Sequence, residues 1–414
     1  MNNPKIRFKG YTDAWEQRKF KDTFDFLQNN SLSRAELSSE NGEVVNVHYG
    51  DILVKYGEVL DVKKDILTYL LDTSIVKKYP ASLLHNGDVI IADAAEDETV
   101  GKCSEIAGLT DEIVLSGLHT IPCRPKEKYA EGFLGYYMNS NAYHNQLLPL
   151  LQGTKVSSIS KSAIQDTDIV YPKCEAEQEQ IGKFFRNLDN LITLHQRKCE
   201  ETKTLKKYML QKMFPQDGES VPEIRFAGFT DAWEQRKFGS LLNETREKTT
   251  VEDEDTLLSC AINGMYLNSE LFSHFRGQSN IGYLKVKKND LILSAQNLHL
   301  GNCNVNSRFE HGIISPAYKV YELVDCNPLF MQAWVKMDKT KDFFLRASTE
   351  GASVCRKNIV WEELYKQELV IPEYKEQEKI GEYFSSLDTL ITLHQRKCDE
   401  LQNIKKFMLQ NMFT

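Results

Sequence analysis

Two long stretches of the chain carry apolar residues at helical spacing. Apolar side chains recur three and four residues apart from Ile181 to Met213, and the same register returns from Ile380 to Met412. Neither stretch contains an internal proline, so each predicts one helix of about 55 Å at 1.5 Å per residue. An apolar seam of this length needs a partner, and we expect the two helices to form an antiparallel coiled coil. The alternative is that each helix packs only on its own domain.

The rest of the chain has a mixed pattern. Short strand-like runs at 51–54, 88–91 and 291–294 each follow a turn signal of glycine or asparagine with aspartate. Residues 133–138 and 330–335 are predicted as short helices. Alternation of such elements indicates compact α/β domains.

The chain contains an internal duplication. Residues 6–20 recur at 224–238 with 13 of 15 positions identical, and residues 177–214 recur at 376–413. The offsets of the two repeats are 218 and 199, so the second block between them is 218 − 199 = 19 residues shorter. The order is a short repeat, a variable block and a long repeat, twice over, which is far too long a period for a solenoid.

This organisation predicts an α+β fold in which two α/β domains are separated by the antiparallel coiled coil and related by a pseudo-two-fold axis. The predicted segments are a short repeat (1–20), a first α/β domain (21–172), a long helix (173–214), a linker with the second short repeat (215–238), a second α/β domain (239–372) and a second long helix (373–414).

Composition narrows the function classes. A net charge of −8 and a pI near 5.7 argue against a protein that coats nucleic acid, although local basic patches remain compatible with that charge. No apolar run approaches the roughly 18 residues of a membrane span. Nine cysteines occur without metal-ligand spacing. We therefore expect a cytoplasmic protein with reduced cysteines, no membrane association and no structural metal.

No catalytic motif is present. The sequence lacks a Gly-x-x-x-x-Gly-Lys-Ser/Thr loop, a Gly-x-Ser-x-Gly elbow and a His-Glu-x-x-His pair. Glu373 and Lys375 have the spacing of some nuclease motifs, but no strand carboxylate accompanies them, and we interpret the triplet as chance. We expect no catalytic residue and no cofactor in this chain.

The repeats carry a family resemblance. The alternation of a Phe-Thr-Asp-Ala-Trp-Glu-Gln-Arg-Lys type repeat, a divergent block and a Glu-Gln-x-x-Ile-Gly helix ending in Met-Phe resembles the specificity subunits of type I restriction-modification enzymes. The strings at 49–53, 87–90 and 315–318 also resemble that family, and the resemblance covers essentially the whole chain.

The resemblance implies a non-catalytic protein that binds double-stranded DNA. Each variable block would be a target recognition domain reading one half of a bipartite site, while the helices set the spacer and dock two modification (methyltransferase) subunits. Restriction subunits, which are ATP-dependent nucleases and translocases, would join the complex. S-adenosylmethionine, ATP and Mg would bind in those partner subunits. A rigid helix pair suits readers that must be about one DNA turn, roughly 34 Å, apart.

Candidate DNA contacts are less specific than the repeats. Near the end of each variable block, Gly153 and Gly351 precede polar segments in which backbone and side chains could reach phosphate. Amides and arginines elsewhere have the chemistry that reads adenine and guanine. For each candidate the alternative is ordinary solvated surface. The candidates are Lys55, Tyr56, His119, Thr154, Lys155, Ser157, Arg276, Gln278, Asn280, Gln296, Asn297, Ser353, Arg356 and Lys357.

The repeats themselves supply candidate scaffold and partner-binding residues. Trp15 and Trp233 would either close the scaffold against the helix ends or anchor a partner subunit. His195 and His394 interrupt the apolar seam at matching positions, together with Leu191 and Leu390. In a fully overlapped antiparallel pair the two imidazoles would meet near the midpoint and fix the register; alternatively, both rings point to solvent.

Two rival functions remain at this point. A duplicated coil with two α/β domains is also compatible with a scaffold that binds other proteins and no DNA. A self-contained methyltransferase is disfavoured because no Asn/Asp-Pro-Pro-Tyr/Phe string is present to hold a flipped adenine.

Overall fold

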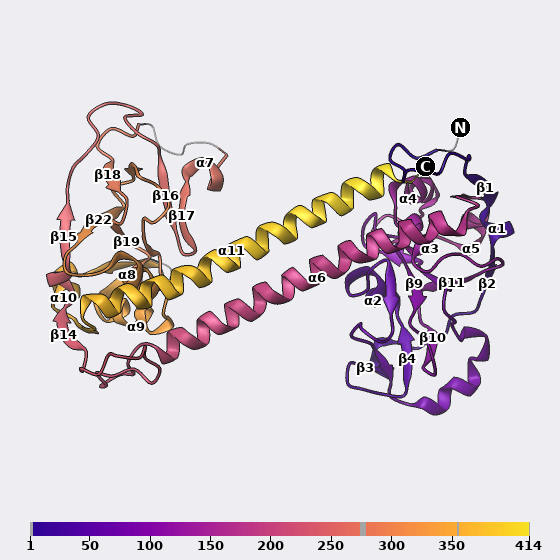
Figure 1. Cartoon of the computed structure of the whole chain (residues 1–414), viewed down its shortest axis with the longest axis horizontal. Helices are drawn as coiled ribbons and strands as arrows, with labels where there is room; N and C mark the ends of the chain where they lie inside the picture. The colour runs from indigo at the N-terminus through magenta and orange to yellow at the C-terminus, as the bar shows by residue number, and fades with distance from the viewer. Residues whose placement is uncertain (1–2, 274–278, 354–355, 414) are drawn as a thin grey trace. The chain divides into compact units, whose positions relative to one another are not determined.

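The computed structural model describes residues 3–273, 279–353 and 356–413, with the side chains of 350–356 left out. It divides into two compact units: unit 1 comprises residues 1–195 and 396–414, and unit 2 comprises residues 196–395 (Figure 1). Each long helix contributes residues to both units. The chain is a mixed α+β protein, as the sequence predicted.

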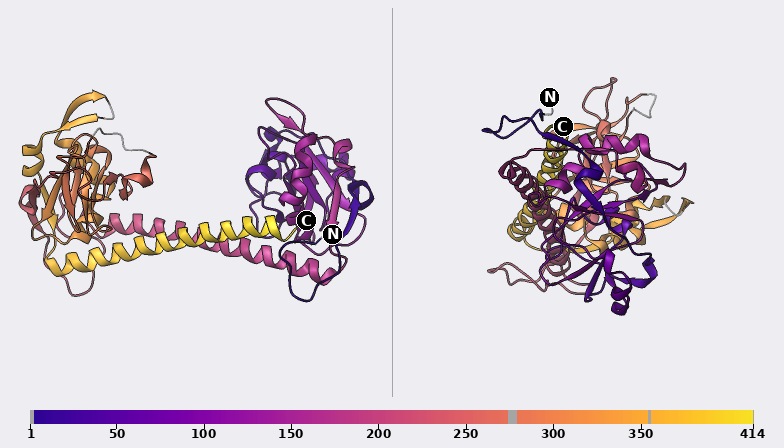
Figure 2. Two further views of the ribbon diagram at one scale, coloured as in Figure 1. Left: turned by 90° about the horizontal axis from the view of Figure 1, so that it is seen from above. Right: turned by 90° about the vertical axis from the view of Figure 1, so that its right-hand side faces the viewer.

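The two long helices are continuous, as Figures 1 and 2 show. Helix α6 spans Glu175–Lys212 and helix α11 spans Tyr374–Asn411, 38 residues each. Pro172 and Pro372 precede their first turns, and acidic residues in those turns suit the positive end of the helix dipole. The sequence prediction of two long helices is confirmed.

Within each unit the two helices pack antiparallel. In unit 1, Ile181 and Phe185 near the start of α6 share a core with Met412 near the end of α11. In unit 2, Met213 just beyond the end of α6 shares a core with Ile380 near the start of α11. The predicted antiparallel pairing is therefore confirmed, and within each unit it buries the part of the apolar seam that lies near the helix ends.

Unit 1 is built around a five-stranded sheet of order β2-β11-β7-β9-β5 and a four-stranded sheet of order β10-β4-β6-β3. Its strands are β1 Glu16–Lys19, β2 Phe24–Phe26, β3 Leu37–Ser38, β4 Val44–Val47, β5 Val59–Asp61, β6 Tyr69–Leu70, β7 Val89–Ala92, β8 Ala94–Ala95, β9 Cys103–Ala107, β10 Ile113–Ser116, β11 Thr120–Pro125, β12 Ser157–Ser158 and β13 Asp168–Tyr171. Its short helices are α1 Phe20–Thr23, α2 Tyr49–Val54, α3 Phe133–Met138, α4 Asn141–Leu147 and α5 Lys161–Ile164.

Unit 2 has a four-stranded sheet of order β15-β22-β19-β20 and several two-stranded pairs. Its strands are β14 Glu234–Lys237, β15 Leu242–Thr245, β16 Leu258–Ala261, β17 Gly264–Leu267, β18 Leu284–Lys287, β19 Leu291–Ser294, β20 Cys303–Val305, β21 His311–Ile314, β22 Tyr318–Leu323, β23 Ser348–Ser353, β24 Arg356–Ile359 and β25 Glu368–Ile371. Its short helices are α7 Asn268–Leu271, α8 Pro328–Val335, α9 Asp338–Arg346 and α10 Trp361–Lys366.

The two units share a common arrangement of their elements. Each short repeat forms a strand, β1 or β14, that pairs antiparallel with the strand preceding a long helix, β13 or β25. In both units a central strand, β7 or β19, lies between a long strand (β11 or β22) and a second neighbour (β9 or β20). The duplication seen in the sequence is therefore a duplication of fold.

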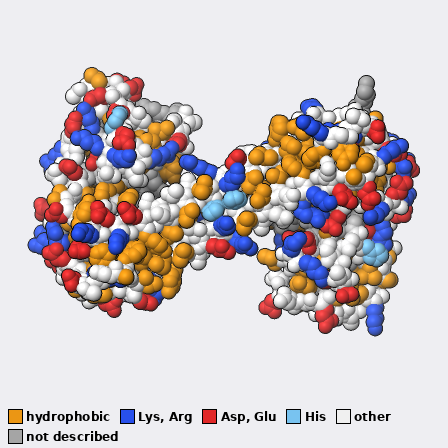
Figure 3. All heavy atoms as spheres, viewed as in Figure 1, with side chains coloured by type: hydrophobic (Ala, Val, Ile, Leu, Met, Phe, Trp, Pro, Cys, Tyr) orange, Lys and Arg blue, Asp and Glu red, His pale blue; other side chains and the backbone are white. Residues whose placement is uncertain are grey.

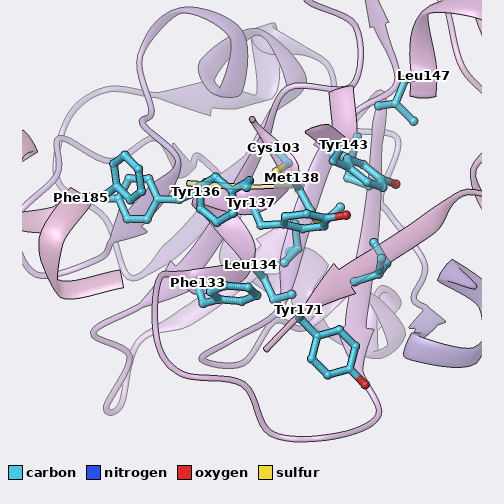
Figure 4. Close-up of a cluster of buried hydrophobic side chains, with 14 of the residues drawn as sticks. Cys103, Phe133, Leu134, Tyr136, Tyr137, Met138, Tyr143, Leu147, Tyr171 and Phe185 are labelled. Carbon is cyan, nitrogen blue, oxygen red and sulfur yellow. The ribbon is translucent and has the colours of Figure 1, made fainter. Parts of the chain in front are cut away.

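The main core of unit 1 joins the sheet to the long helices through α3, all six residues of which are buried. Figure 4 shows Tyr136 of α3 beside Phe185 of α6, with Phe133 and Tyr137 of α3 in the same cluster. The rings of Tyr136 and Phe185 stack with centroids 5.0 Å apart. Such aromatic packing fixes the α/β domain on the helix.

One predicted strand is wrong. Residues 51–54 lie in helix α2, whose first turn is capped because the His48 Nδ1 accepts a hydrogen bond from the Gly50 N–H at 3.2 Å. The apolar run in this segment buries Ile52, but its backbone bonds are local. The strand predicted at 88–91 is present as β7, the strand at 291–294 is β19, and both predicted short helices are present.

Candidate functional site

The short repeats clamp the ends of the long helices. In unit 1 the guanidinium of Arg7 donates to both carboxylate oxygens of Glu177, at 2.7 and 2.8 Å, and in unit 2 Arg225 does the same with Glu376, at 2.7 Å to each oxygen. Both glutamates are almost fully buried. A bidentate pair in such a position is strong and directional. Each short repeat therefore fixes the first turn of one long helix.

The same repeats also bind the end of the other helix. The backbone N–H of Ile6 donates to the carbonyl of Asn411 at 2.9 Å, and that of Ile224 donates to Lys212 at 2.9 Å. Asn411 and Lys212 are matching positions of the two copies. Each unit thus closes around the start of one long helix and the end of the other.

The Glu-Gln-x-x-Ile-Gly motif has a structural role at each position. The Gln178 side chain donates to the Pro172 carbonyl at 2.8 Å and accepts from Ala130 at 3.0 Å, and Gln377 makes the equivalent bonds in unit 2. A methyl group on Gly182 would lie 2.7 Å from the Glu131 carbonyl oxygen. The motif therefore seats the α/β domain on the helix at close approach.

The two repeat tryptophans are core residues. Trp15 is 4% exposed, packs edge-on against Phe133 and Phe413, and donates from Nε1 to Glu177 at 3.3 Å. Trp233 is also 4% exposed and packs against Phe214. Closure of the scaffold therefore explains both rings, and neither offers its ring face to a partner subunit.

The other repeat candidates lie differently. Leu191 and Leu390 occupy matching positions on the two helices, and each side chain is 43% exposed. His195 and His394 are half-buried in the middle of α6 and α11. Whether the two imidazoles face each other stays a prediction.

In unit 1, candidate DNA contacts gather at the end of the central strand β7. The His119 backbone, at a φ of 54°, accepts from the Asp93 N–H at 3.1 Å, and the His119 Nδ1 lies 3.2 Å from the Asp93 Oδ1. Tyr49 at the start of α2 contacts the His119 ring edge-on, with centroids 5.2 Å apart. Ser157 in β12 pairs with Ala95, two residues beyond Asp93. The topology thus joins four segments that are far apart in the sequence.

An open depression beside this cluster adds a basic group that the sequence analysis missed. It is lined by Arg34, His48, Tyr49, Gly50, Asp51, Val54 and Lys55. The Arg34 guanidinium donates to both oxygens of Asp51, at 2.7 and 2.8 Å; the Arg34 side chain is 60% exposed and that of Asp51 only 2%. The ion pair raises the pKa of Arg34 and holds its planar group at the surface. No sequence pattern linked the two residues, because the pair bridges 17 positions in unlike segments.

The surface around this depression carries acidic, basic and apolar side chains. Burial raises the pKa of the Asp93 carboxyl and lowers the pKa of His48. The exposed Lys55 donates to Thr68 at 3.1 Å and Val54 is 89% exposed beside it. Charged, aromatic and apolar groups therefore share one surface, a combination that suits contacts to base edges.

Two candidates, Tyr56 and Asn280, are buried, and their role in DNA contact stays a prediction. Tyr56 is 3% exposed in the core of unit 1, and burial raises the pKa of its phenol to about 12. Asn280 is also 3% exposed; its amide donates to Asp253 at 2.7 Å and accepts from the Asp253 N–H at 2.8 Å. The Asn280 amide is thus satisfied by internal partners, and the Tyr56 ring belongs to the core of unit 1.

In unit 2 the equivalent surface brings three segments together by main-chain bonds. The Lys357 N–H donates to the Gln296 carbonyl at 3.1 Å, and the Ala295 N–H donates to Ala317 at 2.9 Å. Gln296 is exposed and Asn297 is half-buried. These segments correspond to those around Ala95 and His119 in unit 1, so the two units present their candidates at matching places in the fold.

The remaining candidates are exposed loop residues or lie partly or wholly outside the described residues. Thr154 and Lys155 are exposed in the loop before β12. Ser353 ends β23 and Arg356 begins β24, but their side chains are outside the described part. Arg276 and Gln278 lie outside the described residues, so both stay predictions.

In the part of the chain that the structure describes, neither a metal site nor a membrane-spanning helix is found. Within residues 3–273, 279–353 and 356–413, no group of three or more His, Cys, Asp or Glu side chains could hold a metal ion. In the same residues, no helix combines the length and apolar character needed to cross a bilayer. Figure 3 shows acidic and basic side chains interspersed on the face it draws.

The fold and this arrangement define a class of protein: a duplicated scaffold of two antiparallel helices that carries two dissimilar α/β domains. A family model described as type I restriction modification DNA specificity domain matches residues 12–204. Over that stretch, and over most of its length in one relative, the chain is similar to type I restriction-modification specificity subunits.

Relatives match over different lengths. The putative type I restriction enzyme MjaX specificity subunit of Methanocaldococcus jannaschii is 22% identical over 431 residues, 97% of this chain and 93% of that protein. The MjaVIII specificity subunit of the same organism is 25% identical over 205 residues, 48% of this chain and 45% of that protein. The crystal structure of the S subunit of a type I restriction-modification system from M. genitalium has a TM-score of 0.60 at 12% identity, covering 100% of this chain and 99% of that one. That structure supports the fold.

Proposed function

We propose that the two α/β domains each read one half of a bipartite DNA site and that the helices set the spacer between the halves. One observation carries the proposal: the ion pairs that clamp the helix ends recur at matching positions, whereas the sequences of the two α/β domains diverge. The pairs Arg7–Glu177 and Arg225–Glu376 lie at matching positions of the repeats, whereas the Arg34–Asp51 pair lies in a variable block that shares little sequence with the other block. A constant frame with divergent surfaces suits two independent readers.

We further propose that the outer faces of the helices dock two modification subunits. Large apolar side chains are exposed at matching positions, which would be costly for a free helix in water and are typical of partner contacts. In unit 1 they are Leu191, Ile404 and Phe407, and in unit 2 they are Leu390, Leu205 and Tyr208. Two like sites favour two copies of one partner.

In this proposal the chain supplies recognition only. Methylation and cleavage, with S-adenosylmethionine, ATP and Mg, take place in the modification and restriction subunits. The complex works in the cytoplasm, where its DNA lies, and the free thiols of the eight described cysteines suit a reducing compartment.

Exchange of one domain tests the proposal. Residues 21–172 are replaced by the corresponding block of a related subunit, and the chimera is expressed with its modification partner. Methylome sequencing is expected to show a change in one half of the methylated sequence, with the other half and the spacer intact. A change in both halves would contradict independent readers.

Duplex DNA retention distinguishes the proposal from a protein-interaction scaffold. The chain with its modification partner is titrated with DNA at several salt concentrations, because phosphate contacts weaken as salt rises. Absence of a DNA footprint at every salt concentration would favour the scaffold function.

A further inference from the structure

Unit 2 contains a groove with an unusual concentration of positive charge. It lies between the C-terminal half of α6 and the corner where α8 passes into α9, and its volume is about 580 Å³. Its charged lining consists of Lys203, Lys206, Lys207, Lys336, Lys339, Asp338 and Asp388. Five lysines thus face two aspartates in a chain whose net charge is −8.

Two of these lysines are desolvated without an acidic partner. Lys336 Nζ donates to the carbonyls of Ile262 and Cys303, at 2.6 and 3.1 Å, and Lys339 Nζ donates to the carbonyl of Pro215. Among the described residues neither forms an ion pair, and burial lowers the pKa of both. An ammonium carries three N–H donors, so both lysines retain donors for an anion.

The fold does not require the charge of Lys336. Lys336 follows α8 as its C-cap, and Asn139 occupies the same place after α3 in unit 1. The Asn139 amide donates to the Cys103 carbonyl at 2.8 Å, just as Lys336 binds Cys303 at the start of the corresponding strand. A neutral amide therefore makes the structural bond in one copy.

Lys339 shows the same asymmetry. It is the second residue of α9, where α4 has Ala142. The lysines of the α8–α9 corner are thus specific to the second α/β domain, because the matching positions of unit 1 carry uncharged residues.

We propose that this lysine groove binds phosphate groups, either of a nucleic-acid backbone or of a free polyphosphate such as a nucleotide carries. Phosphate offers several acceptor oxygens at full negative charge, and it can therefore engage the unused donors of Lys336, Lys339 and the exposed Lys207 together. An anion would also offset the partial desolvation of these two half-buried ammonium groups. The site is separate from the proposed reading of half-sites.

The duplication provides a matched control for the test. Lys207 on α6 lines the groove, and Lys406 is its copy on α11, exposed and outside it. The variants are K336N, which copies the residue of unit 1, K207Q and the control K406Q. Full-length proteins are titrated calorimetrically with inorganic tripolyphosphate, and thermal unfolding checks that each variant folds.

Wild type and K406Q are expected to bind tripolyphosphate alike, whereas K336N and K207Q bind about tenfold more weakly, because each loses one charge-assisted contact. If K336N does not fold, K207Q provides the test, because Lys207 is exposed and its replacement is not expected to disturb the fold. Equal binding by all four proteins, no binding by wild type, or an equal loss in K406Q would overturn the proposal.

A second arm identifies the source of the phosphate. The same proteins bind a mixed-sequence duplex at a series of KCl concentrations, and a backbone contact in the groove lowers the slope of log K against log salt by about 1 in K207Q. An unchanged slope with weakened tripolyphosphate binding assigns the groove to a free polyphosphate. If none of the four proteins binds the duplex, the result counts against half-site reading. The tripolyphosphate titration would still show whether the groove binds phosphate.

Discussion

At the scale of single residues, burial separates structural from functional candidates. Tyr56 and Asn280 have suitable chemistry for DNA contact but lie inside their units. Arg34 lies in a polar stretch without a pattern, yet its exposed guanidinium is held by the buried carboxylate of Asp51. A side chain held in this way loses less conformational freedom on binding.

Replacement of Arg34 tests the reading surface of unit 1. We expect R34A to weaken binding of the specific duplex about tenfold, because a bidentate base contact contributes roughly 1–3 kcal/mol to discrimination. R34K keeps the charge without the planar fork and is expected to restore non-specific binding but not sequence preference. Fluorescence anisotropy with specific and mixed-sequence duplexes measures both. If R34A binds the specific duplex like wild type, with an unchanged melting temperature, Arg34 has no role in reading.

A buried carboxyl group in unit 1 predicts a pH dependence of stability. Glu105 accepts from Gly132 and Gly135 at 2.6 and 2.9 Å, and burial raises its pKa from 4.5 to about 7. The folded state therefore holds the proton more tightly than the unfolded state. Stability falls as pH rises from about 4.5 to about 7, by about 3 kcal/mol from this group, and the loss is complete above pH 7.

E105Q removes this titration. Urea unfolding of wild type and E105Q at pH 5, 6, 7 and 8 is expected to show a shallower fall in the variant. The difference between the two proteins isolates Glu105 from other groups such as Asp290, whose pKa burial raises to about 6. Parallel curves would show that Glu105 is ionised in the folded protein throughout this range.

At the scale of elements, the helices carry matched polar contacts beside their apolar seam. Lys405 of α11 contacts Asp189 of α6 and Glu58 of the α/β domain, each at 2.6 Å. Its copy on α6, Lys206, contacts Asp388 at 2.5 Å. Burial opposes the charge of Lys405, but the two carboxylates raise its pKa overall. The same lysine thus links three elements in unit 1 and two in unit 2.

The pair K405A and K206A tests this difference. We expect K405A to lower the free energy of unfolding by about 3 kcal/mol, because it leaves two largely buried carboxylates without a partner. K206A is expected to lose about 1 kcal/mol, since Asp388 is 48% exposed and remains hydrated. Chemical denaturation of both variants gives the comparison. Equal losses would mean that Glu58 contributes nothing to the contact.

At the scale of the whole molecule, the proposed function makes the long helices a spacer. An insertion between Phe214 and Pro222 would not lengthen α6, because that helix ends at Lys212. A heptad must instead enter both helices at matching positions, after His195 and after His394. It would add about 10 Å to each helix at 1.5 Å per residue, or about three base pairs of DNA.

We expect this double insertion to leave both half-sites unchanged and to lengthen the methylated spacer. Single insertions serve as controls, because each shifts one seam against the other and is expected to abolish activity. Methylome sequencing reads half-sites and spacer together. Full activity with the original spacer would show that the helices do not set the distance.

By itself the sequence determined the duplication and the two long helices, and it favoured their antiparallel pairing. These follow from periodicity and identity, which are local or repeated signals, and an apolar seam leaves few ways of being buried. The family resemblance rested on the same repeats. Short strands and helices with strong apolar runs, such as 133–138 and 291–294, could also be predicted from the sequence.

Only the tertiary structure decided which candidates reach the surface and which residues meet. The helix at 49–54 depends on a His48 cap, the Arg34–Asp51 pair joins unlike segments, and the lysine groove combines residues more than 100 positions apart. Burial and long-range pairing are properties of the packed chain, since a side chain's chemistry does not say whether its neighbours will cover it. Periodicity and identity therefore determined the helical scaffold of this protein, and packing determined which side chains reach its surface.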